Sequence, residues 1–171
     1  MKSLEYKQKK VLDKFQNSPK FKILFVCSGN IIRSPYAHLL FNHKIRNDKR
    51  LSKRLIIDSG AVKYQNSVIS QETYSHLLKA GLSKEEILLF KPKYLGKIPE
   101  LIEDSDLILV MEKKHLKYIP SSKLDHTFLL LEFALGREED IPDPYINQPY
   151  EKAYNLIDLS IQKLYDLFKR K

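Results

Sequence analysis

The sequence predicts an α/β protein, a single domain with a four-stranded parallel β-sheet flanked by helices on both faces. Short apolar runs alternate along the chain with longer stretches whose apolar residues have helical spacing, which is typical of parallel strands joined by crossover helices. The apolar runs are continuous, as in strands buried on both faces. With 171 residues, the chain is long enough to bury one sizeable core.

The individual elements follow from these runs and from the turn residues between them. Strands are expected at residues 21–26, 55–62, 107–111 and 127–131, and helices at residues 3–17, 35–46, 70–81, 98–103, 113–119 and 149–171. Ser34 and Pro35 suit the N-cap and the first position of the second helix. Gly81 suits the left-handed residue that ends the third helix. We expect residues 87–90 to be extended and residues 132–145 to form an acidic loop.

A basic N-terminal extension, residues 1–20, precedes the main domain at residues 21–171. Leu4, Val11 and Phe15 have helical spacing among lysines in this extension, which predicts a short amphipathic helix. Because this helix comes before the first strand, we expect it to be an appendage of the domain.

The formal net charge of +9 is concentrated in residues 2–22 and 44–54. Scattered charge of this kind is typical of a solvated surface. No recognisable nucleic-acid-binding module and no basic strand interleaved with aromatic residues accompanies it. We therefore expect no specific nucleic-acid partner, and only a general attraction for phosphorylated substrates.

The single cysteine excludes an internal disulfide framework and a multi-cysteine metal site. We expect no bound metal and no cofactor. No apolar run approaches the ~18 residues that span a bilayer, and residues 1–22 contain no apolar signal-peptide core. We therefore expect a cytoplasmic protein with no membrane partner, and a monomer.

The lone cysteine opens a small polar loop between the first strand and the second helix. Residues 27–35 read Cys-Ser-Gly-Asn-Ile-Ile-Arg-Ser-Pro. A loop of this kind at a helix N-terminus can turn its backbone N–H groups inward as an anion-binding nest. Arg33 would close the nest with a planar fork that matches two phosphoryl oxygens. The N–H groups would come from Ser28, Gly29, Asn30, Ile31 and Ile32.

Cys27 lies in the field of these groups, which favours its thiolate form. A thiolate below a bound phosphate is placed for in-line attack on phosphorus. Ser34 would donate a hydrogen bond to the sulfur and ease its departure in a second step. The alternative is a buried core cysteine at a strand end, because this spacing of Cys, Arg and Ser also arises by chance. The context of strand, polar loop and helix start favours the phosphate loop.

Residues 25–35 resemble the phosphate loop of the low-molecular-weight protein tyrosine phosphatases. Ile-Asp-Ser-Gly-Ala at 57–61 and Asp-Leu-Ile-Leu-Val-Met at 106–111 are similar to that family's second and third strands. Ile-Pro-Asp-Pro-Tyr at 141–145 is similar to the segment that carries its general acid. The resemblance spans residues 21–168 and implies the same four-stranded parallel sheet.

The resemblance also implies roles for three residues. Cys27 would be the nucleophile that forms a phosphocysteine intermediate, and Arg33 would bind the phosphoryl oxygens. Asp143 would protonate the leaving phenolate and then activate water. Its acidic neighbours at 138–140, if close in space, would favour the protonated form of Asp143 by like-charge repulsion. The alternative for Asp143 is a turn-forming Asp-Pro in a surface loop.

Three further positions bear on the substrate. Tyr64 and Tyr145 match family positions whose aromatic side chains wall the cleft, which implies a deep slot for a phosphotyrosine ring; the alternative for each is ordinary loop packing. Related phosphoarginine phosphatases resemble this loop but carry threonine where this chain has Ile31. Ile31 therefore favours phosphotyrosine.

The chain departs from the family pattern at several positions, three of which bear on the loop and its partners. Ile32 replaces a second cysteine, so the disulfide that protects an oxidised nucleophile in many relatives cannot form. Phe90 replaces a histidine of the polar network that braces the loop asparagine, which puts the support of Asn30 in doubt. Glu112 stands where aspartate is usual.

The main prediction is a metal-independent protein tyrosine phosphatase that acts on phosphotyrosine-containing proteins and binds phosphate or other oxyanions in its loop. A phosphoarginine phosphatase of the same fold is one alternative. A catalytically weak phosphotyrosine-binding module is another, although a pure binder would not need Asp143. Arsenate reductases share the loop but need further cysteines downstream, so a single cysteine argues against that activity. A basic nucleic-acid-binding or scaffold protein would use residues 2–22.

Overall fold

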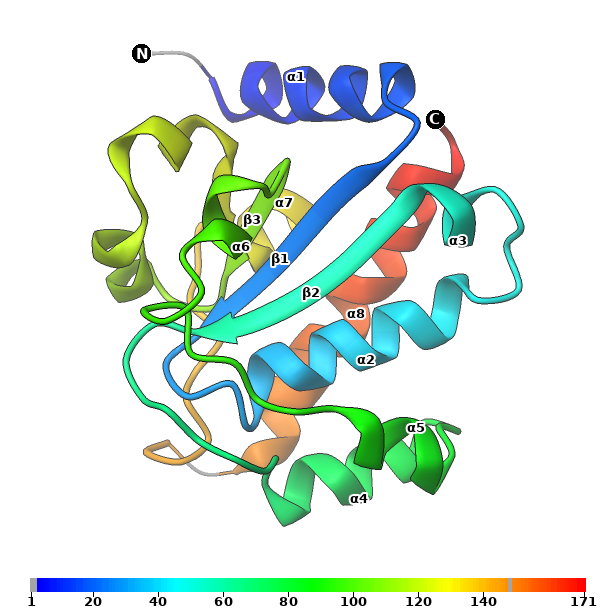
Figure 1. The fold of residues 1–171 in the computed structure, drawn as a ribbon. Coiled ribbons are helices and arrows are strands. Elements are labelled where there is room, and N and C mark those ends of the chain that lie inside the picture. The colour runs from blue at the N-terminus through cyan, green and yellow to red at the C-terminus, as the bar shows by residue number, and fades with distance from the viewer. Residues whose placement is uncertain (1–2, 148) are drawn as a thin grey trace.

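The computed structural model describes residues 3–147 and 149–171. Its centre is a four-stranded sheet with the order β2-β1-β3-β4, in which every neighbouring pair is parallel. The strands are β1 (Phe21–Cys27), β2 (Leu55–Ala61), β3 (Leu107–Val110) and β4 (Thr127–Leu129). The predicted α/β class and parallel sheet are confirmed (Figure 1).

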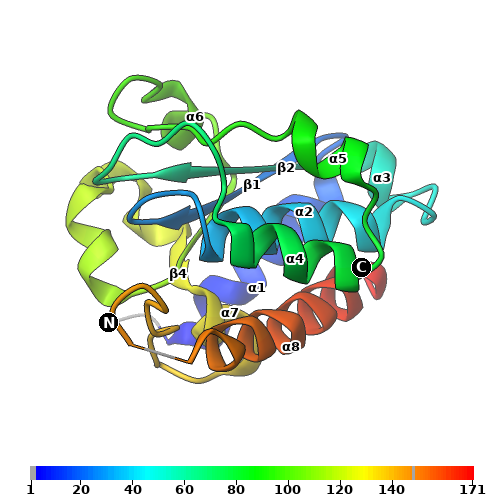
Figure 2. The same cartoon turned by 90° about the horizontal axis from the view of Figure 1, so that it is seen from below.

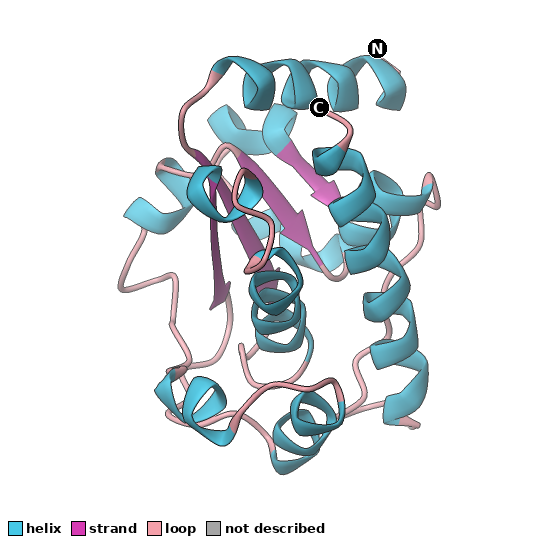
Figure 3. Ribbon diagram, turned by 90° about the vertical axis from the view of Figure 1, so that its right-hand side faces the viewer, coloured by secondary structure: helices cyan, strands magenta, loops and turns pink. Residues whose placement is uncertain are grey.

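Helices cover both faces of this sheet. The α-helices are α1 (Leu4–Asn17), α2 (Arg33–Ile45), α3 (Leu51–Arg54), α4 (Gln71–Lys79), α5 (Lys84–Leu89), α6 (Glu100–Glu103), α7 (Leu130–Leu135) and α8 (Tyr150–Lys169), and the 3-10 helices are η1 (Lys113–Tyr118) and η2 (Ser121–His126). Helices α2, α7 and α8 lie on one face and α6 on the other (Figures 2 and 3). Within the residues that the structure describes, no helix is both long enough and apolar enough to cross a bilayer.

Strand β1 supplies side chains to both faces. Ile23 and Phe25 belong to the core shared with α2 and α8, whereas Leu24 and Val26 belong to a second core shared with β3 and α6. Successive side chains of a strand point to opposite faces, so a strand between two helix layers needs apolar residues at every position. This double burial explains the continuous apolar run in the sequence.

The strand order determines where a ligand can bind. Strand β1 pairs with β2 on one side and with β3 on the other. In open parallel sheets, ligands bind beyond the carboxyl ends of the strands, at the point where the connections diverge to the two sides. Strand β1 ends at Cys27, so the polar loop follows directly at this point.

Two short helices stand where the sequence predicts other structure. Residues 87–90 belong mainly to α5 rather than to an extended segment, because Ser83 and Glu86 form a capping box that starts the helix. The strand expected at 127–131 is shorter, since α7 begins straight after β4. The acidic segment is irregular only beyond Gly136, whose φ of +69° ends α7. The short elements α3 and η2 carry no clear periodic pattern and are not anticipated.

Helix α2 begins earlier than predicted. Its first residue is Arg33, and the N-cap position, Ile32, makes no side-chain cap hydrogen bond. The prediction that Ser34 is the N-cap is therefore wrong. The Ser34 hydroxyl instead lies against the sulfur of Cys27 and the amide of Asn30.

Helix α1 is part of the core rather than an appendage. Phe15 is fully buried and packs edge-on against the rings of Phe21 (centroids 5.6 Å apart) and Phe168 (4.9 Å). The Arg54 guanidinium lies 4.3 Å from the centre of the Phe15 ring, and Gln8 donates a hydrogen bond to the carbonyl of Phe133. Figure 1 shows α1 crossing the end of the molecule where β1 begins.

These contacts predict that α1 stabilises the whole domain. Replacing Phe15 by alanine removes a buried ring, so Phe15→Ala should lower the free energy of unfolding by about 3–5 kcal/mol in urea titrations. The exposed neighbour Gln16 offers a matched control. Gln16→Ala should change the free energy of unfolding by less than about 0.5 kcal/mol. Equal stability of the two variants would contradict the structural role of α1.

Candidate active site

Cys27 lies at the end of β1 and is almost fully buried. Its Sγ is 2.9 Å from Ser34 Oγ and accepts a hydrogen bond from the backbone N–H of Asn30 at 3.2 Å. Donors that face a sulfur stabilise its thiolate. The two contacts therefore suit Cys27 to carry negative charge.

Asn30 determines which way the Ser34 proton points. Its Nδ2 donates to Ser34 Oγ at 2.8 Å and to Ser59 Oγ at 3.0 Å, and its Oδ1 accepts from the backbone N–H of Lys93 at 2.9 Å. Since Ser34 Oγ accepts from Asn30, the hydroxyl proton of Ser34 remains for Cys27. Asn30 has a φ of +54°, a left-handed conformation that asparagine tolerates better than most residues.

A histidine from α2 completes this bracing network. His38 Nδ1 lies 2.9 Å from Ser59 Oγ, and the Phe90 ring packs edge-on against the imidazole, with centroids 5.5 Å apart. The loss of histidine at position 90 therefore does not leave Asn30 unsupported. Ser59 and His38 are absent from the predicted site. The helical spacing of His38, four residues after Ser34, is the signal that could have placed it on the same face.

The carbonyl groups of the loop are fixed from outside. Ser28 O accepts from the N–H groups of Lys63 and Tyr64, and Gly29 O accepts from Asn66 Nδ2 at 2.9 Å. Ile31 O accepts from the backbone N–H of Ser70 at 2.9 Å and from Thr73 Oγ1 at 3.0 Å. Carbonyls held in this way are consistent with the inward-facing N–H groups of an anion nest.

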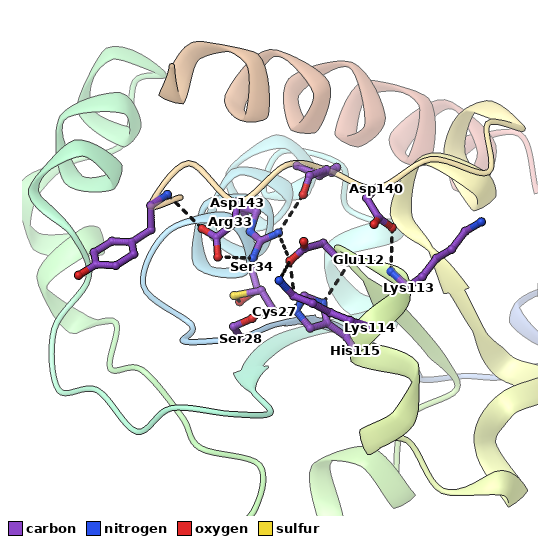
Figure 4. A network of polar contacts seen from close by, with 12 residues as sticks. Cys27, Ser28, Arg33, Ser34, Glu112, Lys113, Lys114, His115, Asp140 and Asp143 are labelled. Carbon is purple, nitrogen blue, oxygen red and sulfur yellow. Dashed lines mark hydrogen bonds and ion pairs between the residues drawn. The ribbon is translucent and has the colours of Figure 1, made fainter. Parts of the chain in front are cut away.

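Arg33 links the loop to two distant segments. Its side chain is 2% exposed, and Nη1 donates to Glu112 Oε2 and to Ile141 O, both at 2.8 Å. Its Nη2 lies 3.2 Å from Asp143 Oδ2 (Figure 4). Glu112 therefore still reaches the arginine although aspartate is usual there. Partial burial raises the pKa of Glu112, but the charge and hydrogen bond of Arg33, with those of Lys114, hold it below its usual value.

Asp143 faces Arg33 rather than other acids. Its Oδ1 accepts from the backbone N–H of Tyr145 at 3.1 Å. The acidic neighbours have other partners: Glu138 pairs with Lys113 at 2.9 Å, and Asp140 accepts from the backbone N–H of the same lysine. Glu139 pairs with Arg137. The expected like-charge repulsion is therefore not the interaction that surrounds Asp143.

The predicted residues gather around one cleft of about 600 Å³. Tyr64 and Tyr145 line it and are 52% and 77% exposed, as expected of walls at its mouth. Asn30 and Ser34 lie buried behind the loop instead. The remaining predicted residues that line the cleft are Cys27, Ser28, Gly29, Ile31, Ile32, Arg33 and Asp143, together with Lys63, Gln65 and Asn66, which sequence reasoning did not select.

A second buried histidine contacts the loop from η1. His115 Nε2 lies 3.0 Å from Ser28 Oγ, and its Nδ1 accepts from the backbone N–H of Glu112 at 3.1 Å. Burial, and then the charge of Arg33, lower the pKa of His115 to about 4. Burial lowers the pKa of His38 to about 4 as well. Within residues 3–147 and 149–171, no group of three or more His, Cys, Asp or Glu side chains is arranged to hold a metal ion.

Comparisons with known proteins agree with this geometry. The sequence model of a family described as "Low molecular weight phosphotyrosine protein phosphatase" matches residues 22–171. The low molecular weight protein-tyrosine-phosphatase PtpA of Staphylococcus saprophyticus is 30% identical over 148 residues, which cover 83% of this chain and 90% of that protein.

Two solved structures are similar as well. A low molecular weight protein tyrosine phosphatase from T. tengcongensis is 31% identical, with a TM-score of 0.68 over 86% of this chain and 99% of that chain. The YwlE arginine phosphatase from Geobacillus stearothermophilus is 27% identical, with a TM-score of 0.70 over 88% of this chain and 94% of that chain.

The two buried histidines predict how stability depends on pH. Each has a pKa of about 4 in the folded protein and 6.5 when unperturbed, so the unfolded chain binds more protons between these values. The free energy of unfolding should therefore fall as the pH falls from 6.5 to 4, by roughly 2–3 kcal/mol for each histidine. Urea titrations across this range measure the fall.

The variants His38→Gln and His115→Gln each remove one of these titrating groups. In each variant the free energy of unfolding should fall less steeply between pH 6.5 and 4 than in the parent protein. Between pH 6.5 and 7.5 it should change little in the variants and in the parent. A fall that is equally steep in both variants and in the parent would show that these histidines are not buried in their neutral form.

Proposed function

The chain belongs to the low molecular weight phosphotyrosine protein phosphatase family, and on that premise we propose that it hydrolyses phosphotyrosine in proteins and other aryl phosphate monoesters. One observation carries the proposal. Cys27 and Arg33, from the phosphate loop, and Asp143, from the distant acidic loop, line the same cleft. A nucleophile, an anion clamp and a carboxyl group are the parts that metal-independent transfer of a phosphoryl group requires.

The first chemical step forms a phosphocysteine. The thiolate of Cys27 attacks phosphorus in line with the bond to the phenolic oxygen, so that an S–P bond forms as the P–O bond breaks. The phenolate would leave as a strong base, and Asp143 donates its proton to that oxygen. The products of this step are the free tyrosine side chain, the phosphocysteine and the Asp143 carboxylate.

The second step regenerates the enzyme. Asp143 accepts a proton from a water molecule whose oxygen attacks phosphorus, and the S–P bond breaks to release inorganic phosphate. The departing thiolate is stabilised by the Ser34 hydroxyl, at 2.9 Å, and by the backbone N–H of Asn30. These donors keep the sulfur a good leaving group in this step and a ready nucleophile in the next turnover.

Arg33 changes partners during this cycle. Its Nη1 stays anchored to Glu112 and to the carbonyl of Ile141, which leaves Nε and Nη2 to meet two phosphoryl oxygens. The Nη2 side is paired with Asp143 in the structure. A bound phosphate dianion therefore displaces Asp143 from Arg33, and a proton on Asp143 removes the repulsion between the carboxyl and the phosphate.

The walls of the cleft favour an aromatic substrate. Tyr64 and Tyr145 stand on the loops after β2 and after Asp143, where they can enclose a planar ring. The alternative substrate is phosphoarginine, since a similar structure is that of an arginine phosphatase. Ile31 lines the cleft and offers a guanidinium no hydrogen-bond acceptor from its side chain. A catalytically weak binding module is disfavoured because it would not need Asp143.

The substrates, ligands, location and oligomeric state of the protein are predictions. We expect phosphotyrosine-containing proteins as substrates, and inorganic phosphate and other oxyanions as ligands of the loop. A cytoplasmic location, a monomeric state and the absence of a cofactor remain predictions from the sequence. So does the division into an extension at 1–20 and a domain at 21–171, which is close to the family match at 22–171.

The mechanism predicts two distinct losses of activity on para-nitrophenyl phosphate. Cys27→Ser should abolish turnover, and Asp143→Ala should lower kcat by about 10²–10⁴-fold. Asp140→Ala is the matched control, because Asp140 lies on the same loop but bonds to the backbone of Lys113; it should retain activity close to that of the parent. Normal turnover by the Cys27→Ser variant would show that Cys27 is not the nucleophile.

The substrate assignment predicts a preference among phosphopeptides. The parent protein should release phosphate from a phosphotyrosine peptide at least about 10-fold faster than from matched phosphoserine and phosphoarginine peptides, with or without a metal chelator. Ile31→Thr should raise the phosphoarginine rate, whereas Ile31→Val should not. A parent enzyme that prefers phosphoarginine would overturn the role given to Ile31.

A further inference from the structure

The contact between Ser28 and His115 has a defined proton arrangement. A backbone N–H can only donate, so His115 Nδ1, which lies 3.1 Å from the N–H of Glu112, is an acceptor and carries no proton. In the neutral imidazole the proton is then on Nε2. That proton is donated to Ser28 Oγ at 3.0 Å. Figure 4 shows Ser28 next to Cys27 with His115 beside it.

This arrangement excludes one role for the pair and leaves another. His115 cannot accept the Ser28 proton while its Nε2 carries one, so the pair is not a nucleophile with its general base. The Ser28 oxygen accepts from His115, and its own proton is left for a different acceptor. Among the residues that the structure describes, Ser28 Oγ has no second hydrogen-bond partner. Ser28 lines the cleft directly after Cys27.

Burial, together with the charges of Arg33 and Lys114, keeps the imidazole in this neutral state against the opposing charge of Glu112. Arg33, Glu112 and Lys114 are the charged groups that face His115. His115 Nε2 is 3.6 Å from Glu112 Oε2, while the amide of the same glutamate fixes Nδ1 and its carboxylate holds Arg33 at 2.8 Å. Glu112, the N-cap residue of η1, therefore positions both the phosphate-binding arginine and the histidine. Burial keeps this imidazole neutral at physiological pH.

We propose that Ser28 donates its hydroxyl proton to a non-bridging oxygen of the bound phosphoryl group, and that His115 is a positioning residue that orients this hydroxyl. The proposal rests on the proposed phosphatase function, because it adds a donor to the same anion site. The loop would bind the phosphoryl group through its backbone N–H groups, and Arg33 would bind it through its charged guanidinium. Ser28 would supply a side-chain donor whose direction is fixed from behind the loop.

The test measures phosphate binding and turnover separately. Ser28→Ala should weaken inhibition by inorganic phosphate about 10-fold and lower kcat/KM for para-nitrophenyl phosphate by a similar factor, since a hydrogen bond to a charged group is lost. Ser28→Thr keeps the hydroxyl and should restore both values. His115→Gln keeps an N–H near the position of Nε2 and should be impaired less than His115→Asn, whose amide cannot reach Ser28.

A double variant separates positioning from a purely structural role. If His115 acts through Ser28, then Ser28→Ala/His115→Asn should bind phosphate no more weakly than Ser28→Ala alone. Independent, additive losses would overturn the positioning role. His43→Gln, at the far end of α2, is the histidine control and should match the parent. Thermal unfolding of each variant identifies losses that come from misfolding.

Phosphate affinity also distinguishes this proposal from the proposed function. Calorimetric titration of phosphate into the Cys27→Ser protein, with and without Ser28→Ala, tests the donor without any turnover. Parent-like phosphate binding and kcat/KM in Ser28→Ala would overturn the role of Ser28 and leave the phosphatase mechanism intact. A parent protein that binds phosphate through Ser28 but hydrolyses no aryl phosphate would instead overturn the proposed function.

Discussion

The buried guanidinium of Arg33 constrains the rest of the site. A charge that is 2% exposed must be paired, and Glu112, the carbonyl of Ile141 and Asp143 supply the partners. These groups come from the end of β3 and from the acidic loop, so the arginine at the start of α2 ties both segments to the phosphate loop. Loss of one partner from a buried ion pair typically costs about 3–5 kcal/mol. The same pairing that compensates the buried guanidinium also places the proposed acid beside the proposed phosphate site.

The phosphate loop is held in place by hydrogen bonds from the surrounding protein. Three hydrogen-bond partners, Ser34, Ser59 and the backbone of Lys93, hold the side chain of Asn30 in place while its backbone adopts a left-handed conformation. Thr73 fixes the carbonyl of Ile31 from the other side. Preorganised donors cost no reorganisation when charge develops on the phosphoryl group. The bracing network is therefore part of the proposed catalytic machinery although most of its members do not line the cleft.

Much of this architecture follows from local sequence patterns, and the remainder depends on contacts between distant residues. Continuous apolar runs and the loop at 27–35 are sufficient to predict the parallel sheet and the place of Cys27. Helix α5 begins at a capping box, and α7 ends at Gly136. These local features outweigh the weak apolar patterns, which suggest other structure. His115 is a single residue with no motif around it, and His38 has only its helical spacing from Ser34 to mark it. Their roles appear only when the fold brings them to Ser59 and Ser28.

In the proposed mechanism the phosphoryl group is transferred first to the sulfur of Cys27 and then to water. The most direct measurement is peptide mapping by mass spectrometry after a rapid quench of the Asp143→Ala variant mixed with an aryl phosphate. We expect phosphate to be attached to the peptide that contains Cys27 and to disappear as the substrate is consumed. Phosphate on another residue, or release of phenol with no phosphorylated Cys27 at any time point, would contradict this mechanism.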